Sequence, residues 1–164
     1  LDGIQAMSKS GSSVVHDAAG RFDRFVDASG RQIIADVGIA VVAERPYAEG
    51  VGDSADLALP AEDLAMVQRV RGSARRLVLI VLSGRPVIIN DLLPLADAVV
   101  VAWLPGSEGA GVADALFGHA PFAGKLPFTW PRSVDQLPFD FAALPADGPD
   151  APLFPVGFGL SSGQ

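Results

Sequence analysis

Three short clusters of polar residues each follow an apolar run, and their residue types could carry chemistry. Residues 44–53 hold two glutamates, whose carboxyl groups could give or take a proton. Residues 83–86 read Ser-Gly-Arg-Pro, and Arg85 could bind a hydroxyl or a carboxylate. Residues 103–109 place a tryptophan beside a glycine-rich turn. Two carboxyl groups on one loop point to general acid/base chemistry.

Each cluster can also be read as an ordinary loop or turn with no functional role, and the sequence pattern alone favours that interpretation. Glu44 and Glu49 could be solvated loop glutamates, and Glu44 would act as a general acid only if burial raised its pKa. Asp53 fits a turn or the approach to a helix. The glycine spacings match neither a dinucleotide-binding nor a P-loop motif, and no Gly-x-Ser-x-Gly is present.

Composition excludes several classes of site. The 164 residues carry 19 Asp+Glu against 12 Lys+Arg, a net charge of −7, with no cysteine and two histidines. Thiol chemistry and a histidine-rich zinc site are therefore not expected, and we expect neither metal nor cofactor. An acidic chain lacks the electrostatic footprint of a nucleic-acid-binding protein. No apolar run approaches the ~20 residues of a membrane span.

The elements that position these clusters are buried parallel strands. Continuous apolar runs at 37–43, 77–82 and 98–102 are typical of strands covered on both faces. Each cluster follows one of these runs directly. Because each cluster follows a parallel strand, the three clusters should share the edge formed by the carboxyl ends of the strands. In open α/β sheets, ligands bind at this edge.

Helical patterns separate and follow the predicted strands. Residues 60–70 begin with Pro and acids and end before Gly72, 108–117 form a second helix, and 90–95 a short third. This order predicts an α/β fold, a three-layer α/β sandwich with a mainly parallel, flavodoxin-like or Rossmann-like sheet.

The chain reads as one domain, residues 1–164, in three parts. Residues 1–36 form an irregular lead-in with a helix end at 4–7 and a short strand near 21–26. Residues 37–120 form the α/β core. Residues 121–164 are rich in Pro and Phe and should wrap over the domain with aromatic anchors.

At these motifs the sequence resembles the second domain of glycoside hydrolase family 3, in its β-glucosidase and exo-β-1,3/1,4-glucanase branch. The resemblance runs from about Leu1 to Leu160, and its motifs are specific only together. They are Glu44-Arg-Pro-Tyr-Ala-Glu-Gly-Val-Gly-Asp53, Leu82-Ser-Gly-Arg-Pro86, the stretch 102–118, Gly124-Lys-Leu-Pro-Phe-Thr-Trp-Pro131, Ser133-Val-Asp-Gln-Leu-Pro138 and Leu153-Phe-Pro-Val-Gly-Phe-Gly-Leu160.

The resemblance implies a retaining glycosidase whose active site lies between two domains. The nucleophilic aspartate would lie on a first, barrel-like domain that nothing in this chain matches, and this domain would supply the acid/base glutamate. Carried over, Glu44 is the acid/base candidate and Glu49 the runner-up, while Ala43 stands where a glycine often precedes the glutamate. Further candidates for shaping the cleft are Arg85, Asp53 and Trp103.

The family's second domain usually has a strand and a Trp-bearing loop before the segment resembling Leu1-Asp-Gly-Ile. We therefore expect an incomplete domain that is inactive alone and needs the barrel domain as its partner. The expected reaction of the whole enzyme is release of glucose from the non-reducing ends of β-glucans. Family members are often exported, so a periplasmic or extracellular location is expected.

Other functions stay open at this point. A non-catalytic carbohydrate-binding or interaction module would bind sugar without a partner domain. Within the family, β-xylosidase and β-N-acetylglucosaminidase activities are alternatives. A small-molecule-binding flavodoxin-like domain is a third possibility, but the chain has no phosphate loop to support it.

Overall fold

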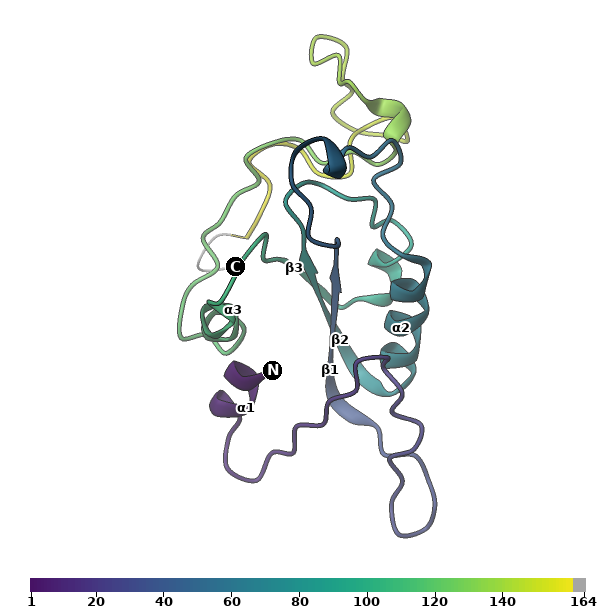
Figure 1. Cartoon of the computed structure of the whole chain (residues 1–164), viewed down its shortest axis with the longest axis vertical. Helices are drawn as coiled ribbons and strands as arrows, with labels where there is room; N and C mark the ends of the chain where they lie inside the picture. Colours follow the sequence, from purple (N-terminus) through teal and green to yellow (C-terminus); the bar gives the residue numbers. More distant parts are fainter. Residues whose placement is uncertain (161–164) are drawn as a thin grey trace.

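The computed structural model describes residues 1–160, and a three-stranded parallel sheet forms its centre (Figure 1). The strands are β1 (Ala35–Ala43), β2 (Ala74–Leu82) and β3 (Ala98–Val101), and they lie in the order β1-β2-β3. All three strands predicted from continuous apolar runs are present. With helices on both sides of the sheet, the predicted α/β sandwich is confirmed.

Helix α2 (Ala61–Gly72) covers one face of the sheet. Pro60 precedes it, two acids stand in its first turn and two arginines in its last, which suits the helix dipole. Val67 and Val70 are buried against the strands. Gly38 of β1 makes this close packing possible, because a Cβ there would lie 2.9 Å from the Val70 side chain.

The opposite face carries α1 (Asp2–Met7) and α3 (Gly109–Leu116), which pack on each other. A Cβ at Gly3 would lie 3.0 Å from a side chain of α3. A groove of about 180 Å³ separates the two helices from the sheet. On this side Val37 and Val41 of β1 stay 54% and 45% exposed, so the expectation that β1 is covered on both faces is wrong for the described residues.

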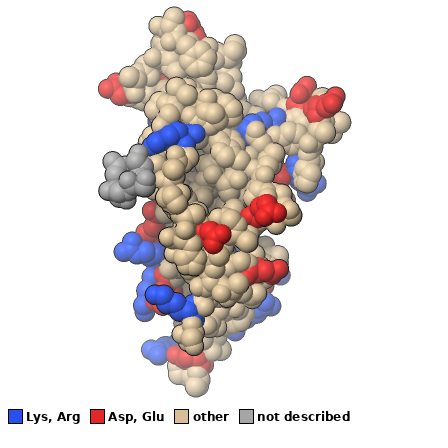
Figure 2. Space-filling model, turned by 90° about the vertical axis from the view of Figure 1, so that its left-hand side faces the viewer, with Lys and Arg blue, Asp and Glu red and all other residues tan. Residues whose placement is uncertain are grey.

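The surface on the side of α1 and α3 carries acidic and basic side chains intermixed (Figure 2). Within residues 1–160, no helix is long and apolar enough to cross a membrane. The same residues contain no group of three or more His, Asp or Glu side chains arranged to hold a metal ion.

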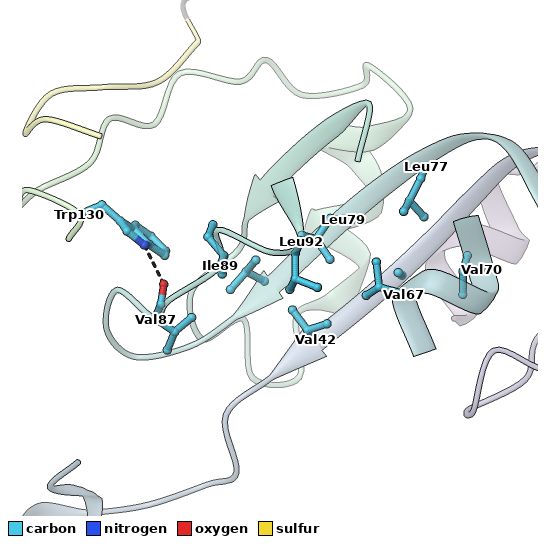
Figure 3. Packing of buried hydrophobic residues seen from close by; sticks show 11 residues of the cluster. Val42, Val67, Val70, Leu77, Leu79, Val87, Ile89, Leu92 and Trp130 are labelled. Carbon is cyan, nitrogen blue, oxygen red and sulfur yellow. Dashed lines mark hydrogen bonds between the residues drawn. The ribbon is translucent and has the colours of Figure 1, made fainter. Parts of the chain in front are cut away.

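The Pro- and Phe-rich tail runs over the carboxyl edge of the sheet, and Trp130 fixes it there. The indole of Trp130 is fully buried, and its Nε1 donates to the Val87 carbonyl at 2.8 Å (Figure 3). Trp130 also pairs with Phe154 in an antiparallel bridge. Four of the tail phenylalanines stay partly exposed, at 37% for Phe122, 45% for Phe128, 72% for Phe141 and 50% for Phe158. The rings of Phe128 and Phe158 nevertheless pack against Trp103 and Phe154.

Two predicted elements differ from the structure. The expected strand near 21–26 does not form, and only an isolated bridge joins Val26 to Gln32. Asp27 closes a tight turn instead, where hydrogen bonds from the Ser29 hydroxyl and nearby backbone N–H groups lower its pKa to about 2. The helix expected at 90–95 is reduced to a 3₁₀ turn, Leu93–Leu95, whose second residue is a proline without an N–H donor.

Replacing Trp130 should therefore destabilise the domain far more than replacing an exposed tail phenylalanine. Trp130→Ala should lower the free energy of unfolding by about 3–5 kcal/mol, because it leaves a cavity. Phe141→Ala should change it by less than about 0.5 kcal/mol. Urea denaturation of both variants measures the difference, and equal losses would show that Trp130 is not the main anchor.

Candidate functional site

The candidate site lies where β1 and β2 end, at the carboxyl edge of the sheet. Ala43 pairs with Leu82, so Glu44 and Ser83 leave the sheet side by side. The Ser83 backbone N–H donates to the Trp103 carbonyl at 3.1 Å, which attaches the loop after β3. The structure thus brings the three sequence clusters to one edge of the sheet.

The Glu44 carboxylate is the centre of a closed hydrogen-bond cluster. The Ser83 hydroxyl donates to its Oε2 at 2.5 Å, and the Tyr47 hydroxyl donates to the same oxygen at 3.2 Å. Arg85 donates to Oε1 from Nε at 2.9 Å and from Nη2 at 2.8 Å. Only 13% of the Glu44 side chain is exposed. Its carboxylate is therefore held within the protein rather than presented to a ligand.

These contacts fix the charge state of the cluster. Burial opposes ionisation of Glu44, but hydrogen bonds from Ser83 and Arg85 and the positive charge of Arg85 outweigh it and lower the pKa of Glu44. Burial and the neighbouring Glu44 carboxylate raise the pKa of Tyr47. These contacts favour the ionised form of Glu44, whereas a proton donor needs its protonated form to be favoured.

The guanidinium of Arg85 makes further contacts inside the protein. Its Nη1 donates to the Gly52 carbonyl at 2.6 Å, and the Tyr47 ring lies over it with 4.5 Å between the guanidinium carbon and the ring centroid. The Arg85 side chain is 27% exposed. Its main partners are therefore residues of the 44–53 loop.

Glu49 is exposed, in contrast to Glu44. It begins a 3₁₀ turn, Glu49–Gly52, and its backbone adopts a φ of +51°. That left-handed conformation is uncommon and costly for a residue with a side chain, and strained residues of this kind cluster at functional sites. Among the described residues, no hydrogen bond or ion pair to the Glu49 carboxylate occurs. Its carboxyl group is available to a substrate.

The other two sequence candidates lie nearby in different settings. Asp53 directly follows the 3₁₀ turn and is exposed. Trp103 is half-buried, and its ring packs edge-on against Phe128 and at 6.0 Å from Trp130. Trp103 also has a φ of +52°, so strained backbone occurs in the loops after both β1 and β3.

A cleft of about 380 Å³ opens beside the cluster. Among the residues that line it, Arg85 is the only charged one. The others come from the strand-end loops and the tail: Leu57, Gly84, Pro86, Phe128, Thr129, Pro131, Leu137 and Phe139. A mostly apolar cleft with one cation suits contact with a ligand ring or with another domain.

Sequence reasoning did not single out Tyr47 and Ser83 as partners of Glu44. The register of β1 on β2 is the signal that places Ser83 beside Glu44. Tyr47 had no such signal, because its position over Arg85 depends on the path of the loop.

Residues 1–162 match the family model described as the glycosyl hydrolase family 3 C-terminal domain. The chain belongs to glycoside hydrolase family 3. This confirms the resemblance seen in the sequence and identifies the chain as the family's C-terminal domain.

Relatives of the chain are named as glycosidases. The chain is 32% identical to the "Periplasmic beta-glucosidase" of Salmonella typhimurium over 77% of this chain and 19% of that protein. It is 31% identical to a "Beta-xylosidase" of Formosa agariphila over 67% of this chain and 17% of that protein. The chain therefore spans less than a fifth of the length of these relatives.

A solved structure is similar in fold as well as in sequence. The exo-1,3/1,4-beta-glucanase of a Pseudoalteromonas species superposes with a TM-score of 0.60 at 40% identity, covering 76% of this chain and 16% of that one. The α/β sandwich at the site is thus shared with a family enzyme.

Removing the charge of Glu44 should have a pH-dependent cost. Because the pKa of Glu44 lies below its ordinary 4.5 in the folded protein, its charge stabilises the fold above that pH, and this stabilisation is lost as the pH falls through the lowered pKa. Glu44→Gln should lower the free energy of unfolding by about 2 kcal/mol at about pH 7 and by clearly less at about pH 3.

Urea denaturation at the two pH values tests this expectation. The control is Asp36→Asn, which breaks an ion pair with Arg75 whose side chains are 86% and 71% exposed. That variant should change stability little at either pH. A cost of Glu44→Gln that is equal at both pH values would contradict the assignment.

Proposed function

We propose that this chain supplies the acid/base group of a retaining β-glucosidase or exo-β-glucanase that releases glucose from the non-reducing ends of β-glucans. The nucleophilic aspartate would come from another domain of the same protein. Family membership and the β-glucosidase relatives support the reaction class. The observation that carries the site is the exposed, strained Glu49 at the carboxyl edge of the sheet.

Glu49, the runner-up from sequence, is the stronger proton-donor candidate of the two glutamates. Arg85 and Ser83 hold Glu44 in its ionised form. Glu49 has no comparable partner among the described residues. When a domain closes over an exposed carboxyl group, water is removed and the protonated form is favoured. Glu44 would then anchor the loop, and Glu49 would contact the substrate.

The proposed reaction has two steps. In the first, the aspartate attacks the anomeric carbon while Glu49 gives its proton to the departing glycosidic oxygen, and a glycosyl–enzyme ester forms. In the second, the Glu49 carboxylate takes a proton from water as that water attacks the anomeric carbon and releases the aspartate. The two carboxyl groups need a separation of about 5–5.5 Å.

A β-xylosidase is the second candidate function. The named β-xylosidase relative, at 31% identity, favours it. Parallel assays with aryl β-glucoside and aryl β-xyloside would separate the two. A periplasmic or extracellular location is proposed with the function, because the Salmonella relative is named as periplasmic.

Leaving-group dependence should identify the proton donor. In the protein that joins this chain to its nucleophile-bearing domain, Glu49→Gln should lower kcat/KM for laminaribiose by about 100-fold or more, because the sugar leaving group needs a proton. It should change kcat/KM for dinitrophenyl β-glucoside much less, because that leaving group departs as an anion. If Glu44→Gln shows this selective pattern and Glu49→Gln does not, Glu44 is the proton donor.

The chain alone should not hydrolyse glycosides, because a retaining mechanism needs a second carboxylate as nucleophile. Purified chain incubated with dinitrophenyl β-glucoside should release dinitrophenol no faster than the substrate hydrolyses without protein. Turnover above that control would contradict the split site.

Isothermal titration with laminaribiose tests the non-catalytic module, since sugar binding by the chain alone would favour it.

A further inference from the structure

We propose that Arg85 is a positioning residue that clamps both ends of the 44–53 loop and thereby sets the position of Glu49. This inference rests on the proposed role of Glu49. It assigns Arg85 to the protein's own loop, although the sequence suggested a contact with substrate.

The clamp is a single planar group that reaches two ends of one loop. Arg85 binds Glu44, the first residue of the loop, through Nε and Nη2, and binds the carbonyl of Gly52 through Nη1 at 2.6 Å. Glu49 lies between these two attachment points. Because the guanidinium fixes both, a shift of Arg85 must change the path of the loop between them.

Tyr47 fills the space between the clamp and the loop. Its ring lies over the guanidinium, and its hydroxyl reaches Glu44. Gly52 leaves room for the ring, because a Cβ at that position would overlap it. Gly84 approaches from the next loop, where a Cβ would lie 3.2 Å from the Tyr47 hydroxyl. Tyr47 thus contacts both the 44–53 loop and the turn after β2, although 39% of it stays exposed.

Arg85 is itself anchored to the end of β2. Its backbone N–H donates to the Ser83 hydroxyl oxygen at 3.1 Å, and Ser83 is 1% exposed. The same hydroxyl donates to Glu44. The clamp therefore connects the 44–53 loop to a buried strand end.

Glu49 is the residue that needs such support. A left-handed backbone on a residue with a side chain persists only when its surroundings hold it. The Cβ position of Gly50, next to Glu49, has no neighbour within 4 Å, so little packing holds the turn at its tip. The contacts at Glu44, Tyr47 and Gly52 instead restrain the backbone at Glu49.

The test compares Arg85→Lys with the parent in the protein that joins this chain to its nucleophile-bearing domain. Lysine keeps the positive charge but has a single nitrogen, so it cannot reproduce the planar set of contacts that Nε, Nη2 and Nη1 of Arg85 make with Glu44 and Gly52. We expect kcat/KM for laminaribiose to fall by about 10- to 100-fold, because a small displacement of a catalytic group has that effect. For dinitrophenyl β-glucoside the fall should be at most a few-fold.

The leaving-group comparison separates positioning from other roles. A substrate-binding or purely structural role for Arg85 would lower kcat/KM for both substrates equally, and that result would overturn the proposal. The control is Arg75→Lys. The Arg75 side chain is 71% exposed and lies near the opposite end of β2, so this variant should leave kcat/KM for both substrates unchanged.

A second pair of variants tests the clamp without changing its charges. Gly52→Ala should displace the Tyr47 ring and reproduce the selective loss for laminaribiose. Gly50→Ala adds the same methyl group where a Cβ meets nothing within 4 Å, and should keep the parent's ratio between the two substrates. Equal behaviour of the two alanine variants would contradict the clamp.

Glu49→Gln in the same assay distinguishes failure of the clamp from failure of the proposed function. If Glu49→Gln shows the selective loss and Arg85→Lys does not, only the clamp is overturned. If Glu49→Gln shows no selectivity, the role of Glu49 is overturned, and the clamp proposal with it.

Discussion

The parallel pairing of β1 with β2 is the constraint on which the site depends. Its register sets Ala43 opposite Leu82, and the next residue of each strand, Glu44 and Ser83, therefore emerges at the same point. A slip of one residue would reverse the faces of every side chain on β1 and remove Glu44 from Ser83. The buried valines and leucines of the sheet thus determine where the polar cluster forms.

The two glutamates of one loop differ because their neighbours differ. Glu44 has three side chains as hydrogen-bond donors and is mostly buried, so its charge is part of the fold. Glu49, five positions later, is exposed on a strained turn. Under the proposed function, the Glu44 carboxylate stabilises the fold and the Glu49 carboxyl group takes part in the reaction. This division agrees with the tendency of proteins to hold strain at functional positions.

Sequence patterns predicted the regular elements well, and loop geometry less well. Continuous apolar runs identified all three strands, and Pro60 with the acids after it marked the start of α2. The choice between Glu44 and Glu49 depends on contacts with Ser83 and Arg85, which lie about forty residues away along the chain. Such contacts leave no local pattern. The tail had the same difficulty, because composition does not reveal that Trp130 turns inward while Phe141 turns outward.

The half-exposed valines of β1 have a consequence for handling the chain by itself. Within residues 1–160, β1 pairs along one edge only, and Val37 and Val41 add apolar surface beside the unpaired edge. An open apolar edge of nine residues is a template for pairing with another copy and so favours aggregation. Charged Asp36, which is largely exposed, opposes this at one end of the strand. Colloidal behaviour of the isolated domain will therefore depend on protein concentration and on what covers β1.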